Sequence, residues 1–203
     1  SVALLLAFGG ILPAGHGGAQ PRGSLRAMLS GPGLRSTLLL GATVTLGTDL
    51  FVFYLPIYGH EQGFSASAIA VVSGCQSLAM FSSRLFMPRL LAWLGMERLL
   101  MAMLFVSALA YFLAPLTGSV VALGIVAAVF GFGMGCGQPL TVMLAYSQSE
   151  AGRGGETLGL RITVNNVVRV AGPLAFGAVA TAFGMLTVFW LNGALLGGSG
   201  LVS

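Results

Sequence analysis

The sequence has few charged residues and no lysine. Only 7% of its 203 residues are charged, whereas soluble domains carry about 25%. So few charges cannot cover a soluble surface, which excludes a cytosolic enzyme, a nucleic-acid-binding protein and a disordered chain. All nine positive side chains are arginine, so lysine-dependent phosphate loops and Schiff-base chemistry are excluded as well. With 56% hydrophobic residues, the chain is expected to lie in a lipid bilayer.

Cysteine and histidine are equally scarce. Cys75 and Cys136 lie in apolar runs, and His16 and His60 lie in polar breaks. These residues cannot supply a disulfide framework or a metal-ligand set, so we expect no metal and no cofactor. Catalysis within the membrane is also disfavoured, because no predicted span contains a histidine and only one contains an acid. We therefore expect that the protein is not an enzyme.

Long uncharged runs predict an all-α integral membrane protein. A helix needs about 20 apolar residues to cross a bilayer. The runs predict five full spans and a sixth that continues to the last residue, namely Ser36–Tyr58, Ser65–Phe86, Leu99–Leu116, Ser119–Tyr146, Thr157–Ala182 and the segment from Met185. Residues 1–12 are apolar but too short to span, and we interpret them as the end of a truncated helix. Because the sequence starts without Met and ends inside an apolar segment, we expect it to be part of a longer protein.

The arginines predict which loops face the cytoplasm. They cluster before the first full span and around every second connection after it, at Arg22, Arg26, Arg35, Arg84, Arg89, Arg98, Arg153 and Arg161. The connections near Glu61, Thr117 and Gly184 contain no arginine. This alternation follows the positive-inside rule, so the arginine-rich loops are expected in the cytoplasm.

Four glycines alternate in the fourth span, just before Pro139. They are Gly131, Gly133, Gly135 and Gly137, and they form two pairs of small residues spaced by four. Such pairs allow close helix packing or bending in a membrane. A dinucleotide-binding motif is the alternative, but Gln138 stands where its third glycine should be.

The order of these features resembles the C-terminal half of a major facilitator superfamily transporter. The resemblance rests on FYLPIYG at 53–59, GFSA at 63–66, RLFMP at 84–88 with LGMER at 94–98, GLRITVNN at 159–166, Gly172-Pro173 and Gly177. It implies a six-helix half-bundle over residues 36–203. It also implies that residues 1–12 end helix six and that residues 13–35 form the cytoplasmic central linker.

The resemblance also implies a function. It suggests a secondary active transporter of the bacterial inner membrane that exports a drug or metabolite in exchange for protons by alternating access. Its partners would be a small-molecule substrate, protons, lipid and an N-terminal six-helix half. The alternative is a six-helix channel or permease of another family, in which an oligomer assembles a ring of Asp49 carboxylates.

Asp49 is the strongest candidate for a functional residue. It is the only acid within a predicted span, about 14 Å from the outer end at Tyr58. An isolated carboxylate at that depth should either take up a proton or meet a positive partner. Either outcome suits proton coupling or cation binding. The alternative is a structural hydrogen bond to a neighbouring helix.

Arg169 is the second candidate. It shares one helix face with Arg161 and Asn165, because the three are spaced by four, and this face could meet a substrate anion or Asp49. Arg169 could instead reach the cytoplasmic surface. Weaker candidates for coupling or substrate binding are Gln76, Tyr54 and Gln138, the last two on helices that the resemblance places at the cavity. The remaining predicted roles are gating at the cytoplasmic loops by Arg84, Arg89 and Arg98, and packing or hinging by Gly131, Gly133, Gly135, Gly137, Pro139, Gly172 and Pro173.

Overall fold

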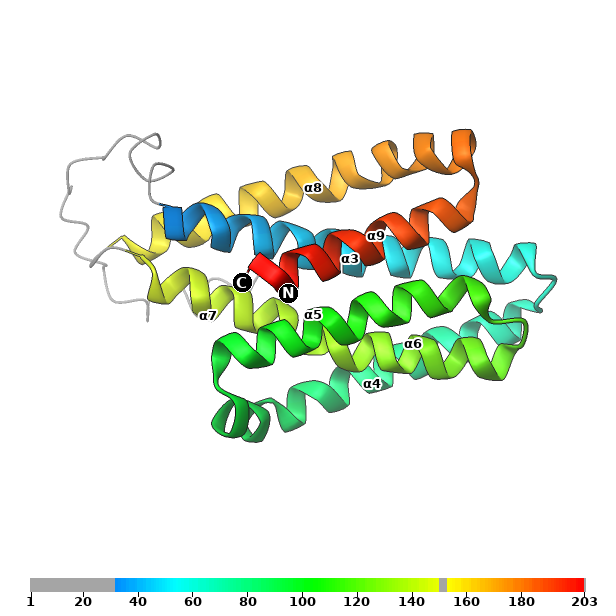
Figure 1. Ribbon diagram of the computed structural model, residues 1–203, viewed down its shortest axis with the longest axis horizontal. Helices are drawn as coiled ribbons and strands as arrows, with labels where there is room; N and C mark the ends of the chain where they lie inside the picture. The colour runs from blue at the N-terminus through cyan, green and yellow to red at the C-terminus, as the bar shows by residue number, and fades with distance from the viewer. Residues whose placement is uncertain (1–31, 150–152, 203) are drawn as a thin grey trace, which may run out of the picture. The chain divides into compact units, whose positions relative to one another are not determined.

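The computed structural model describes residues 32–149 and 153–202. Within them it contains seven α-helices and one 3-10 turn (Figure 1). The elements in chain order are α3 (Pro32–Glu61), α4 (Ala66–Leu94), α5 (Met96–Leu113), η1 (Ala114–Leu116), α6 (Val120–Gly135), α7 (Gly137–Ser147), α8 (Gly154–Phe183) and α9 (Met185–Val202). The predicted truncated helix 1–12 and most of the predicted linker lie outside the described residues.

The prediction of an all-helical membrane protein is confirmed. Five helical segments are long and apolar enough to cross a bilayer, and the segment Val120–Ser147 combines α6 with α7. The shorter apolar helix α9 follows them. An α-helix forms most of its backbone hydrogen bonds within itself, which is what a hydrocarbon environment requires of a spanning segment.

Single glycines make three of the turns. Gly63, Gly95 and Gly184 have positive φ angles of 77°, 76° and 85°, a conformation that side chains with a Cβ rarely adopt. Ser65 and Ser119 then begin α4 and α6, and each side-chain oxygen accepts a hydrogen bond from the third backbone N–H that follows it. These are N-caps, and they fix where α4 and α6 begin.

Two helices extend beyond the predicted spans at their arginine-rich ends. Helix α4 continues to Leu94 rather than ending at Phe86, so only Gly95 separates it from α5. Helix α3 begins at Pro32, inside the predicted linker, and proline is favoured in a first helical turn. The prediction used charge to mark the ends, but helices continue into the headgroup region, where arginine is stable.

The predicted fourth span is interrupted at Cys136. Helix α6 ends at Gly135 and α7 begins at Gly137. The cause is Pro139, which has no amide hydrogen to donate to the carbonyl of Gly135 four residues earlier. Length and hydropathy predicted the span but not this break.

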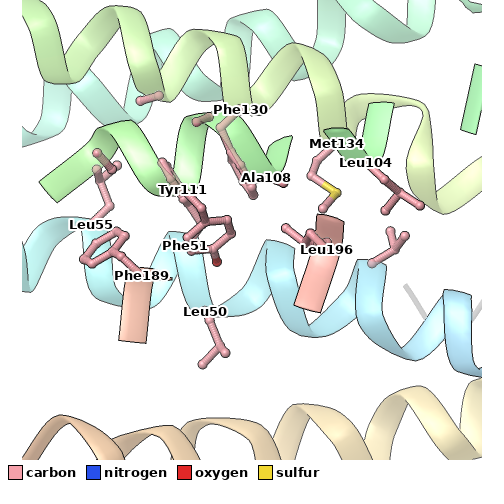
Figure 2. Packing of buried hydrophobic residues seen from close by; sticks show 14 of the residues in the cluster. Leu50, Phe51, Leu55, Leu104, Ala108, Tyr111, Phe130, Met134, Phe189 and Leu196 are labelled. Carbon is pink, nitrogen blue, oxygen red and sulfur yellow. The ribbon is translucent and has the colours of Figure 1, made fainter. Parts of the chain in front are cut away.

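An aromatic cluster forms the centre of the core. The ring of Phe51 stacks on Phe130 with centroids 3.8 Å apart, and it meets Tyr111 and Phe189 edge to face. Figure 2 shows the side chains of Phe51, Tyr111, Phe130 and Phe189 close together in the core. The hydroxyl of Tyr111 donates to the carbonyl of Gly47, so the buried polar end of the ring is satisfied. This cluster joins α3, α5, α6 and α9.

Helices α4 and α6 form the most extensive contact of the bundle, and their backbones approach closely. A Cβ atom added at Gly131 would overlap the backbone of Gln76, and one at Gly135 would overlap the backbone of Met80. Gly133 faces Ser107 on α5 instead, and Gly137 faces Val44 on α3. The alternating glycines therefore allow close approach of three neighbouring helices. Figure 1 shows α4 beside α6 and α8 beside α3.

Candidate substrate and coupling site

An ion pair joins α3 to α8. The Nε atom of Arg169 lies 3.0 Å from Oδ2 of Asp49 and donates a hydrogen bond to it. The two residues are far apart in the sequence, so the pair exists only because α8 packs along α3. Of the three alternatives considered for Arg169, the structure shows the contact with Asp49.

The pair is partly accessible at the bundle surface. The side chain of Asp49 is 31% exposed and that of Arg169 is 57% exposed. Asp49 lies about 18 Å along α3 from Glu61 at 1.5 Å per residue, which is near the middle of a hydrocarbon core about 30 Å thick. Both side chains are therefore accessible from outside the bundle at that depth.

A second polar cluster surrounds Arg161, which is only 6% exposed. Its Nη2 atom donates to the hydroxyl of Thr141 at 2.8 Å and to Oε1 of Gln138 at 3.1 Å. The amide of Gln138 in turn donates to the hydroxyl of Thr45 at 3.0 Å. One chain of hydrogen bonds thus connects α8, α7 and α3.

Two buried polar atoms near these clusters have no hydrogen-bond partner in the part of the chain that the structure describes. Asn165 Oδ1 lies one helical turn beyond Arg161, and Tyr54 Oη faces Gly177 of α8. A buried polar atom without a partner is uncommon in native proteins and calls for a physical reason, such as water or a ligand. Both atoms lie along the contact between α3 and α8.

The break between α6 and α7 is held by α4. Arg84 Nε donates to the carbonyl of Gly135 at 3.1 Å, the group that Pro139 leaves without a helical partner. The neighbouring Cys136 thiol donates to the carbonyl of Ser83 at 3.2 Å. Polar groups at the break are therefore partnered by a donor and an acceptor from a neighbouring helix.

Comparison with known proteins now identifies the chain. The sequence model of the Major Facilitator Superfamily matches residues 37–203. The chain belongs to the major facilitator superfamily. A comparison with curated proteins finds no match.

Family membership confirms the predicted resemblance and the coarse function. The superfamily consists of membrane transporters, generally not enzymes, so this multi-pass protein lies in a lipid bilayer and binds a small-molecule substrate. It also removes the alternative of a channel or permease from another family.

The arginines assigned to the cytoplasmic loop do not lie in a loop. Arg84 and Arg89 belong to α4, and Arg98 belongs to the first turn of α5. All three are exposed, and of these Arg84 makes the contact with α6 described above. The loop is replaced by the turn at Gly95, because α4 continues through Pro88.

Gln76 lies apart from the charged residues. It is buried on α4 against α6, and none of the hydrogen bonds found in residues 32–149 and 153–202 connects it to Asp49 or Arg169. Gly172 and Pro173 lie one turn beyond Arg169 on α8, where Gly172 accommodates the side chain of Leu46. Pro173 leaves the carbonyl of Arg169 without its usual amide donor.

Sequence reasoning missed two threonines of the Arg161 cluster. Thr45 and Thr141 are fully buried and supply the hydroxyl groups of the network. The one available signal was the spacing of Gln138 and Thr141 by three in an apolar run, which places them on the same helix face. Threonine is common in membrane helices, so this signal is weak.

Proposed function

We propose that this protein is a proton-coupled transporter in which residues 36–203 form the C-terminal half. An N-terminal half of six helices would complete the bundle, and the substrate would bind near the midplane between them during alternating access. The family resemblance favours export of a drug or metabolite from a bacterium across its inner membrane. The arginine distribution supports a cytoplasmic position for the turn at Gly95 and for the connection before α8.

The single observation that carries this proposal is the ion pair between Asp49 and Arg169. A carboxylate near the membrane centre is costly unless it is neutral or paired. In the ionised state Arg169 provides the pairing charge. Protonation of Asp49 removes its charge, so the contact between α3 and α8 weakens. A proton would therefore change how strongly the two helices are held together, and this is the property that a coupling residue needs.

Asp49→Asn in the full-length protein tests this proposal. We expect the variant to fold and insert, because the amide keeps the shape of the carboxyl group, while proton-driven transport is abolished because the amide cannot change charge. The measurement is substrate-linked proton flux in liposomes that contain a pH-sensitive dye, at matched protein amounts, for a compound found in a drug-resistance screen. Exchange of that compound down its own gradient should persist.

Glu61→Gln is the matched control, because Glu61 is an exposed acid at the end of the same helix. It should transport with normal proton flux. Unchanged proton flux in Asp49→Asn would exclude Asp49 from coupling. Reduced yield with normal coupling in the folded fraction would assign Asp49 a purely structural role.

A further inference from the structure

Arg161 carries a buried charge, and none of the ion pairs found within residues 32–149 and 153–202 includes it. Its hydrogen bonds within residues 32–149 and 153–202 go to the hydroxyl of Thr141 and to the side-chain and backbone oxygens of Gln138, all of which are neutral. Glu156, the nearest acid along α8, is paired with Arg153, and Asp49 on α3 is paired with Arg169. Arg161 is therefore left without a carboxylate partner among the residues that the structure describes. Burial of an uncompensated charge is costly.

The guanidinium also has unused donors. All three hydrogen bonds of Arg161 come from Nη2. Its Nε atom is buried without a partner, and Nη1 makes no hydrogen bond to any residue that the structure describes. Neutral acceptors thus take up the Nη2 atom of the guanidinium, and the N–H groups of Nε and Nη1 remain for a further acceptor.

Gly41 leaves a space next to these unused donors. A Cβ atom built on Gly41 would lie 3.4 Å from Arg161 Nε and 3.9 Å from the unpartnered Asn165 Oδ1, in ordinary van der Waals contact. A Cβ at position 41 would therefore touch the side of the guanidinium that makes no hydrogen bond, and glycine leaves that place open to one atom of a ligand. Any side chain at position 41 would fill it.

We propose that Arg161 binds an anionic group of the transported molecule, such as a carboxylate or a phosphate, beside Gly41. The proposal rests on the proposed transport function and adds the chemical class of the substrate. An oxygen anion would accept from the remaining donors and balance the excess positive charge, and arginine is well suited to this recognition. Thr141 and Gln138 would hold the guanidinium in place. Arg161 itself would contact the ligand.

Thermal unfolding of the purified full-length protein tests the charge preference. The probes are sodium benzoate and inorganic phosphate, with benzyltrimethylammonium chloride as the cation, all at constant ionic strength. A ligand that binds only the folded state raises the melting temperature. We expect benzoate, phosphate or both to raise it, and benzyltrimethylammonium to leave it unchanged. A response to benzoate alone indicates a carboxylate substrate, and a response to phosphate alone indicates a phosphate.

Two variants assign the effect to this site. Arg161→Gln should weaken binding of the responding anion at least about tenfold, because a charge-assisted hydrogen bond is lost. Gly41→Ala should weaken it as well by filling the space, while its Cβ fits without overlap. Arg153→Gln, which removes an arginine beside Glu156 at the start of α8, should respond like the unmodified protein.

Three results would overturn the proposal: no response to either anion, an equal response to the cation, or an undiminished response in Gly41→Ala. The last variant keeps the test valid even if Arg161→Gln does not fold. Each of these results leaves the proton flux of Asp49→Asn unaffected, so failure of the anion site can be distinguished from failure of the coupling proposal.

Discussion

The contact between α4 and α6 and the contact between α3 and α8 use opposite chemistry. In the first, glycines bring two backbones together and leave no space for a side chain. In the second, an ion pair and partly exposed polar groups connect the helices. The first contact is suited to hold its shape, and the second is suited to change with charge.

The largest expected effect comes from Gly131→Ala. The new methyl group overlaps the backbone of Gln76, which cannot move aside like a side chain, so we expect destabilisation by about 3 kcal/mol or more. Yield and melting temperature after size-exclusion chromatography measure it. Gly124→Ala on the same helix is the control, since its Cβ meets only Val72 at 3.9 Å. Equal stability of the two variants would refute the backbone contact.

A smaller effect is expected at the break between α6 and α7. Arg84→Ala removes the donor to the Gly135 carbonyl and should cost about 1–2 kcal/mol. Pro139→Ala restores an amide donor to the same carbonyl. The double variant should therefore be more stable than the sum of the two single effects predicts. Strict additivity in melting experiments would show that Arg84 does not compensate for the proline.

The smallest effect is expected from Gly172→Ala. Its methyl group overlaps only the end of the Leu46 side chain, which can rotate away, and alanine gains about 1 kcal/mol in helix propensity over glycine. We expect a net change below about 1 kcal/mol in either direction. A melting temperature as low as that of Gly131→Ala would show that the α3–α8 contact is as rigid as the α4–α6 contact, contrary to our expectation.

The sequence predicted the helices better than their contacts. Hydrocarbon thickness sets a minimum span length, so long uncharged runs reveal where helices lie. Charge marked the ends poorly, because α4 continues past Arg84 and Arg89 to Leu94. The break at Cys136 depends on Pro139 and on a donor from another helix, and hydropathy contains no information about either.

The candidate site was predictable in part. The depth of Asp49 and the spacing of Arg161, Asn165 and Arg169 were evident from helix periodicity. Periodicity gives the face of one helix but not the helix that packs against it. It therefore could not distinguish Arg169, which meets a carboxylate, from Arg161, which meets neutral oxygens.

The glycines of α6 also limit how this region can evolve. Every replacement of glycine by another amino acid adds a Cβ atom. At Gly131 and Gly135 that atom would overlap the backbone of α4. Such replacements require α4 to shift first or at the same time. Sequence drift should consequently be slow at these two positions and faster at Gly124, where a Cβ is accommodated.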